Sequence, residues 1–84
     1  MSEATLQQLV DQILKNNKLT DKEKKDELFF MDCKMYTNLG IESTKKEREE
    51  TKKKSRVIYR GIREIDFYLG SALLRTQDDK KKAQ

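Results

Sequence analysis

An all-α fold is predicted by three features of this sequence: it has no proline, its three glycines are isolated, and its apolar residues recur at helical spacing. Lysine, glutamate, leucine and glutamine, which lose little side-chain freedom in a helix, recur throughout. A length of 84 residues, with 35% hydrophobic and 40% charged residues, allows one small domain over 1–84 with little apolar material to bury. We expect a short N-terminal helix followed by a hairpin of two longer helices.

The first predicted helix spans residues 3–15. Its apolar residues recur at intervals of three and four and therefore lie on one stripe. They are Leu6, Leu9, Val10, Ile13 and Leu14. Ser2 can cap the helix, and Asn16 and Asn17 end it, because asparagine competes for backbone hydrogen bonds and tolerates the left-handed conformation. A short loop over 17–19 follows.

A second helix is expected over 20–39. Thr20 and Glu23 have the spacing of a capping box, in which each side chain satisfies a backbone N–H. The apolar residues form two adjoining stripes, so the expected buried arc is wide. The stripes are Leu28, Met31, Met35 and Leu39, and beside them Phe29, Cys33 and Tyr36. We place Cys33 in the core as a small hydrophobe, and Gly40 at the C′ position that ends the helix.

The third and longest helix is expected to run without interruption over 44–76. Thr44 and Glu47 form a second capping-box match at its start. Its first half, through Lys54, has no apolar residue and persists through solvated ion pairs. Its second half is amphipathic. The main stripe is Ile58, Ile62, Ile65, Leu69, Ala72 and Leu73, with Val57, Tyr68 and Leu74 beside it.

The length of this third helix predicts a homo-oligomer. A helix of 33 residues is about 50 Å long, whereas a compact domain of this size has a radius of gyration of about 12 Å, so the helix must project and find a partner. Gly61 and Gly70 lie inside it, which indicates close backbone packing or ligand approach. We expect residues 77–84 to be a frayed tail.

The net charge of +4 is concentrated on the same helix, where residues 44–63 hold nine basic and three acidic side chains. The basic residues are Lys45, Lys46, Arg48, Lys52, Lys53, Lys54, Arg56, Arg60 and Arg63. This pattern is typical of a solvated helix face, of a phosphate site, or of general nucleic-acid binding through counterion release. Composition does not separate these alternatives.

Several classes of function are disfavoured by the residues that are missing. The chain has no histidine, the commonest zinc ligand and general acid or base, and its single cysteine cannot form an internal disulfide. Glu64 and Asp66 point about 200° apart on a helix and make no catalytic pair. No glycine-rich phosphate loop, signal peptide or apolar membrane span is present. We therefore predict a soluble cytoplasmic protein that is not an enzyme and uses no cofactor, metal or membrane.

A family resemblance is carried by residues 56–75, which read RVIYRGIREIDFYLGSALLR. This stretch resembles the C-terminal helix of small phage proteins, the anti-CBASS cyclic-oligonucleotide sponges, and of the related anti-Thoeris sponges. Residues 62–65 correspond to the family's acidic turn, 67–68 to its bulky pair and 71–75 to its closing segment. Upstream, residues 17–20 look like the family's Lys-x-Thr element. The resemblance covers less than half of the chain.

The resemblance implies helical hairpins in a homo-oligomer, often a hexamer, that withholds cyclic di- or trinucleotides from immune effectors without cleaving them. Lys18 and Thr20 would hold phosphate or ribose in a pocket shared between protomers. Lys53 and Arg56 lie near the position of the family's phosphate-binding arginine, although residues 51–55 replace its usual Gly-Arg-Glu. Arg60 is added as a further cation and Tyr36 as an aromatic that could stack on a base. The candidate ligand-binding residues are therefore Lys18, Thr20, Lys53, Arg56, Arg60 and Tyr36.

The leading hypothesis is therefore a cyclic-oligonucleotide sponge, acting in the host cytoplasm if the protein is of phage origin. Two alternatives remain open. One is a small helical inhibitor or adaptor that binds a partner protein, and the other is a basic nucleic-acid-binding protein.

Overall fold

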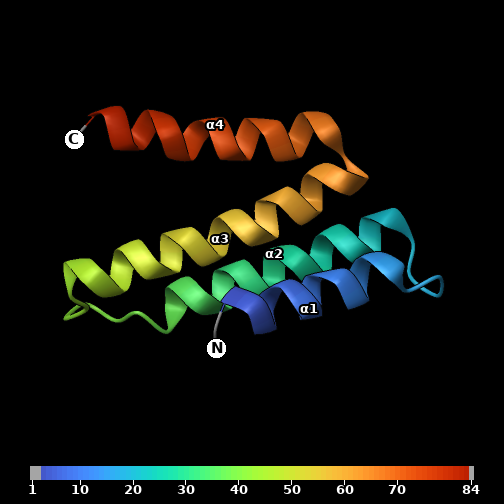
Figure 1. The fold of residues 1–84 in the computed structure, drawn as a ribbon, viewed down its shortest axis with the longest axis horizontal. Helices are drawn as coiled ribbons and strands as arrows, with labels where there is room; N and C mark the ends of the chain where they lie inside the picture. The colour runs from blue at the N-terminus through green and yellow to red at the C-terminus, as the bar shows by residue number, and fades with distance from the viewer. Residues whose placement is uncertain (1–2, 84) are drawn as a thin grey trace.

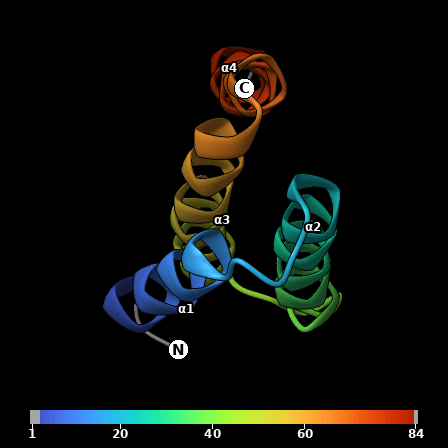
Figure 2. The same ribbon diagram turned by 90° about the vertical axis from the view of Figure 1, so that its right-hand side faces the viewer.

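The structure, a computed structural model, describes residues 3–83 and places side chains as far as Gln77. The described residues form four α-helices and no strand, which confirms the all-α prediction. The helices are α1 (Glu3–Lys15), α2 (Asp21–Thr37), α3 (Lys45–Ile65) and α4 (Phe67–Ala83). α1 and α2 both lie along α3, and α4 lies on the opposite side of α3 (Figures 1 and 2). The predicted Ser2 cap falls outside the described residues.

The two capping boxes predicted from the sequence are present. The Thr20 hydroxyl accepts from the Glu23 N–H at 3.2 Å, and the Glu23 carboxylate accepts from the Thr20 N–H at 3.0 Å. The corresponding distances between Thr44 and Glu47 are 3.1 and 3.4 Å. These bonds to Thr20 hold the pKa of Glu23 below its usual value. α2 ends before the predicted boundary at residue 39, and Gly40 follows in the left-handed conformation, with φ +70°.

The prediction of one uninterrupted helix over 44–76 is wrong, because the chain turns back at Asp66. This residue has an extended backbone (φ −137°, ψ 93°), and its carboxylate caps α4 by accepting from the Leu69 N–H at 3.1 Å. The Lys25 ammonium lies 3.4 Å from the same carboxylate. The hydrogen bond from the Leu69 N–H is the main cause that lowers the pKa of Asp66; burial opposes it, and Lys25 adds to the lowering. α4 consequently returns along α3.

The turn at Asp66 changes the expected shape of the molecule. The described chain measures 39 × 25 × 19 Å, and α3, at 21 residues, is about 31 Å long rather than 50 Å. The backbone is helical through Ala83, so the frayed tail expected over 77–84 is wrong for the described part of that segment. The homo-oligomer was predicted because a long helix would project from the domain. Since α4 packs along α3 within one chain, that argument no longer applies, and the homo-oligomer stays a prediction.

The core is small and centres on α3. Its fully or nearly buried apolar residues are Leu6, Val10, Leu28, Val57, Ile58 and Ile62. The predicted stripe of α1, apart from Leu9, and the first stripe of α2, apart from Leu39, belong to this core or pack against it. The expectation that Cys33 is buried is wrong, and Tyr36 beside it is 41% exposed. The reason is that α4 contacts no described helix other than α3, so it leaves Cys33 and Tyr36 uncovered, whereas Phe29 of the same stripe packs against the core.

Candidate functional site

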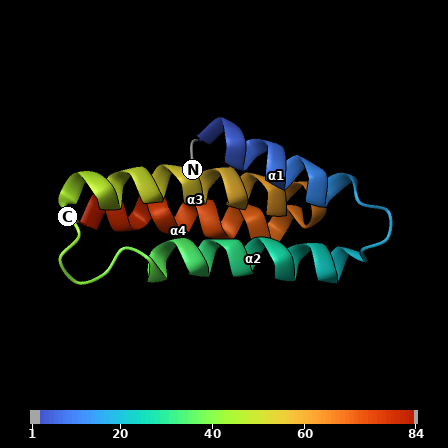
Figure 3. The same ribbon diagram turned by 90° about the horizontal axis from the view of Figure 1, so that it is seen from below.

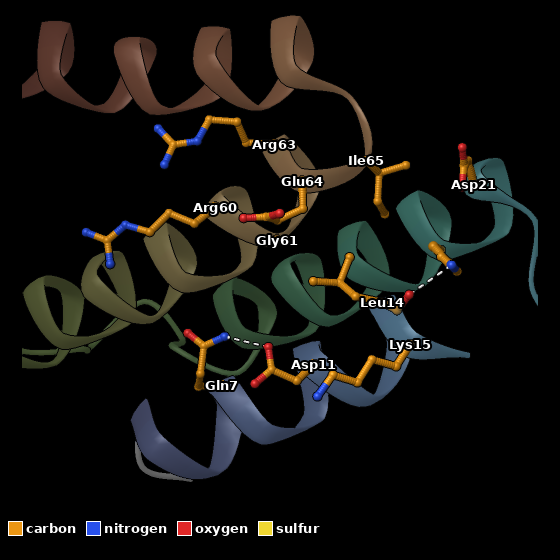
Figure 4. A pocket seen from close by; sticks show the side chains of 11 residues that line it. Gln7, Asp11, Leu14, Lys15, Asp21, Arg60, Gly61, Arg63, Glu64 and Ile65 are labelled. Carbon is orange, nitrogen blue, oxygen red and sulfur yellow. Dashed lines mark hydrogen bonds between the residues drawn. The ribbon is translucent and has the colours of Figure 1, made fainter. Parts of the chain in front are cut away.

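A basic hollow of about 640 Å³ opens between α1, the start of α2 and the second half of α3 (Figure 4). It is lined by four cations and three carboxylates. These are Lys15, Lys24, Arg60 and Arg63, and Asp11, Asp21 and Glu64. The cations come from three different helices, so the hollow exists only once the chain has folded.

The cations of the basic hollow differ in how they are held. Lys24 donates to the Leu14 carbonyl at 2.9 Å, which satisfies an otherwise free carbonyl near the end of α1. Figure 4 shows the side chains of Arg60 and Arg63 extending in the same direction from α3, and Glu64 follows Arg63 on that helix. A guanidinium group can donate several hydrogen bonds to a phosphate or carboxylate. The hollow is therefore suited to a small anionic ligand.

A second hollow, the apolar groove, lies between α1 and α2 over the first half of α3 and holds about 500 Å³. Its apolar walls are Leu6, Leu9, Phe30, Met31 and Met35, and its other lining residues are Glu27, Lys34, Asn38, Thr51 and Lys54. Figure 3 shows that α1 and α2 diverge: they lie closest near the loop that connects them and farthest apart at the start of α1. Phe30 is 66% exposed at this groove, a large apolar surface for a small chain.

A buried carboxylate joins α2 to α3. Asp32 is 93% buried and accepts hydrogen bonds from the Ser55 hydroxyl at 2.5 Å and from the Tyr59 hydroxyl at 2.9 Å. Burial is the main cause that raises the pKa of Tyr59 to about 12; Asp32 adds to the rise and Ser55 opposes it. A carboxylate with two hydroxyl donors and no histidine lacks the parts of a nucleophilic site. We assign this Asp32 cluster to the alignment of α2 with α3.

The raised pKa of Tyr59 predicts a loss of stability in alkali. Because the phenol has a pKa of about 12 in the folded chain and 10.0 in the unfolded chain, its contribution is complete below pH 10 and disappears as the pH rises toward 12. Tyr59→Phe should lower the unfolding free energy at pH 8 by about 1 kcal/mol and reduce its decline between pH 10 and 12. Urea unfolding across this range measures both effects; an unchanged decline in the variant would contradict the assignment.

The six predicted ligand-binding residues occupy three separate places. Lys18 and Thr20 are exposed in the loop before α2, where the Thr20 hydroxyl is engaged in the cap. Tyr36 lies at the other end of α2, about 24 Å of helix away. The remaining three follow one another along α3, and one of them lines the basic hollow. They are Lys53, Arg56 and Arg60. A site combining the loop with Lys53 would therefore need two chains.

No family model, curated protein or solved structure matches this chain. Among the helices of the described part, none combines the length and apolar character that a membrane span requires. The described side chains also contain no group of three histidine, cysteine or carboxylate residues that could hold a metal ion. The two hollows and the Asp32 cluster are consequently the features from which a function can be inferred.

Sequence reasoning identified none of these three features as a site, although Arg60 of the basic hollow was one of its candidate ligand-binding residues. Asp32 was detectable, because it is a charged residue between Leu28 and Met35 on an apolar helix face, and Ser55 and Tyr59 are spaced to share one face of α3. The apolar groove carried no comparable signal. Four of its wall residues were assigned to the apolar stripes of the two helices, and the separation of α1 from α2 is a property of the tertiary structure.

Proposed function

We propose that this protein is a small helical inhibitor or adaptor that binds a partner protein through the apolar groove. The observation that carries the proposal is the groove itself, whose walls on two diverging helices contain five apolar side chains, of which Phe30 is 66% exposed. Exposed apolar hollows with a polar rim are typical of protein-binding surfaces. Met31 and Met35 favour the same role, because flexible thioether side chains adapt to a bound surface. The proposed function requires no catalytic group.

Photo-crosslinking from two matched phenylalanines tests the proposal. Phe30 lines the groove and is 66% exposed, whereas Phe67 lies outside both hollows on α4 and is 64% exposed. Either can be replaced by benzoylphenylalanine with little effect on the core. In cells that make the protein, we expect a discrete adduct with a second protein from position 30 and not from position 67. Similar adducts from both positions would contradict the proposal.

A second candidate function is the cyclic-oligonucleotide sponge, which one observation favours. Arg60, a predicted ligand-binding residue, lies in the basic hollow with Lys15, Lys24 and Arg63, which are cations suited to phosphate. Lys18 would then be contributed by another protomer. This candidate extends the resemblance of residues 56–75 and adds a defined place for the ligand.

Calorimetric titration with cyclic di- and trinucleotides, and with a linear dinucleotide as control, tests the sponge. We expect Arg60→Ala to weaken binding of a cyclic ligand at least about tenfold, because a charge-assisted hydrogen bond is worth about 1.5–3 kcal/mol. Chromatography of the released ligand should recover it intact. The absence of binding across the panel would exclude the sponge and leave the groove proposal untouched.

A further inference from the structure

We infer that the occupant of the apolar groove is a single amphipathic helix of a partner protein whose apolar stripe is flanked by acidic side chains. The inference rests on the proposed function and names the chemistry of the partner. It follows from the shape of the groove, from the charge around it and from the charge of the chain as a whole.

The shape of the groove suits one helix lying between two others. Leu6 and Leu9 form one wall on α1, and Phe30 and Met31 form the other on α2. Figure 3 shows that α1 runs beside only part of α3 and that α1 and α2 lie farther apart toward the start of α1. Side chains spaced by three and four residues on an incoming helix would enter between these walls, as in other helix-in-groove complexes.

The positive charge around the groove favours a partner helix with acidic side chains beside its apolar stripe. Lys34 and Lys54 line it, and neither forms an ion pair with a side chain that the structure describes. The adjoining residues 45–54 of α3 carry six lysines or arginines against three glutamates. Glu27 is the one carboxylate among the lining residues of the groove. A helix with glutamate or aspartate beside its apolar stripe would therefore meet complementary charge along one rim.

A second copy of this chain fits the groove less well. Each chain carries a net charge of +4, so two copies repel each other. Two of the exposed aromatics that could enter the groove of another copy, Phe67 and Tyr68, lie on α4, whose sequence contains four basic and two acidic residues. Placing α4 against Lys34 and Lys54 would bring like charges together. The charge distribution thus favours a foreign acidic helix.

Fluorescence anisotropy with labelled peptides of about four helical turns tests the inference. The probe has a leucine stripe flanked by glutamate; one control peptide carries lysine in place of glutamate, and another has the probe's composition without the stripe. We expect the probe to bind the full-length protein at least about tenfold more tightly than either control, and less tightly at about 300 mM than at 50 mM salt. Equal binding of the acidic and basic peptides would overturn the inference.

Variants of the protein separate the inference from the function on which it rests. Phe30→Ser should weaken binding of the acidic peptide at least about fivefold, and Phe67→Ser should leave it unchanged. Equal losses in both variants would overturn the inference. If position 30 crosslinks to a partner but the acidic peptide does not bind, the proposed function stands and the inference fails. A dimer in analytical ultracentrifugation that Phe30→Ser dissociates would identify a second copy as the occupant and also overturn the inference.

Discussion

Replacing Ile58 by alanine is expected to leave most of the protein unfolded at room temperature. The Ile58 side chain is 0% exposed and lies in a core that has six buried apolar residues among the described side chains. Truncating such a residue to alanine costs about 2–5 kcal/mol, because transfer energy is lost and a cavity remains. The core of a chain this small supplies about 3–5 kcal/mol in total. The loss is therefore comparable to the whole stability of the fold.

Far-UV circular dichroism and urea unfolding measure this effect, and the chain contains its own control. Ile41 is 97% exposed between α2 and α3, so Ile41→Ala should change the unfolding free energy by less than about 0.5 kcal/mol. Ile58→Val removes a single methylene and should fall between the two, at about 0.5–1.5 kcal/mol. If Ile58→Ala unfolds at the same urea concentration as Ile41→Ala, the core is not where the structure places it.

The parts of the fold that were predictable from the sequence are those set by local chemistry. Thr20 and Thr44 each need only the glutamate three residues later to cap a helix, and both helices begin after these residues. The apolar stripe of α1 was also visible, because Leu6 and Val10 are one turn apart and both are buried. Neither conclusion depends on residues far away in the sequence.

The turn at Asp66 was not predictable in this way, because continuing the helix and capping a new one are both compatible with the local sequence. The choice depends on Lys25, which is 41 residues away and pairs with the carboxylate, and on the packing of Leu69 and Leu73 against the core. Cys33 shows the same limit. Its apolar neighbours suggested burial, but whether Cys33 itself is covered depends on how the other helices pack.

For the candidate sites, too, the sequence predicted what depends on local spacing and not what depends on tertiary packing. The sequence showed that α3 is basic and that Arg60 faces away from the apolar stripe, which is a matter of helical spacing. It did not show that Lys15 and Lys24 share a hollow with Arg60, because three helices must first assemble. It also did not distinguish Phe30 from the core, since exposure at a groove and burial in a core require the same residue types.

Replacing Gly70 by alanine is expected to detach α4 from α3. A Cβ atom at Gly70 would overlap the Arg63 backbone at its Cα and N atoms, and a helix backbone cannot move aside as a side chain can. We expect a cost of at least about 3 kcal/mol, at the upper end of overpacking. In a detached helix the same change would instead stabilise by about 1 kcal/mol, since alanine is the better helix former. Faster hydrogen exchange of the amides of 69–77 would report the detachment.

Gly61→Ala is the matched control, because its clash can be relieved. A Cβ atom at Gly61 would lie 2.5 Å from the Val10 Cγ1 atom, so truncation of that side chain in a Val10→Ala, Gly61→Ala double variant should recover part of the loss from Gly61→Ala. No such rescue is available at Gly70, since Arg63→Ala keeps both the backbone and the Cβ atom that obstruct the new methyl group. Rescue of Gly70→Ala by Arg63→Ala would therefore show that α4 is held by side-chain contacts and that the close backbone approach is not what requires glycine.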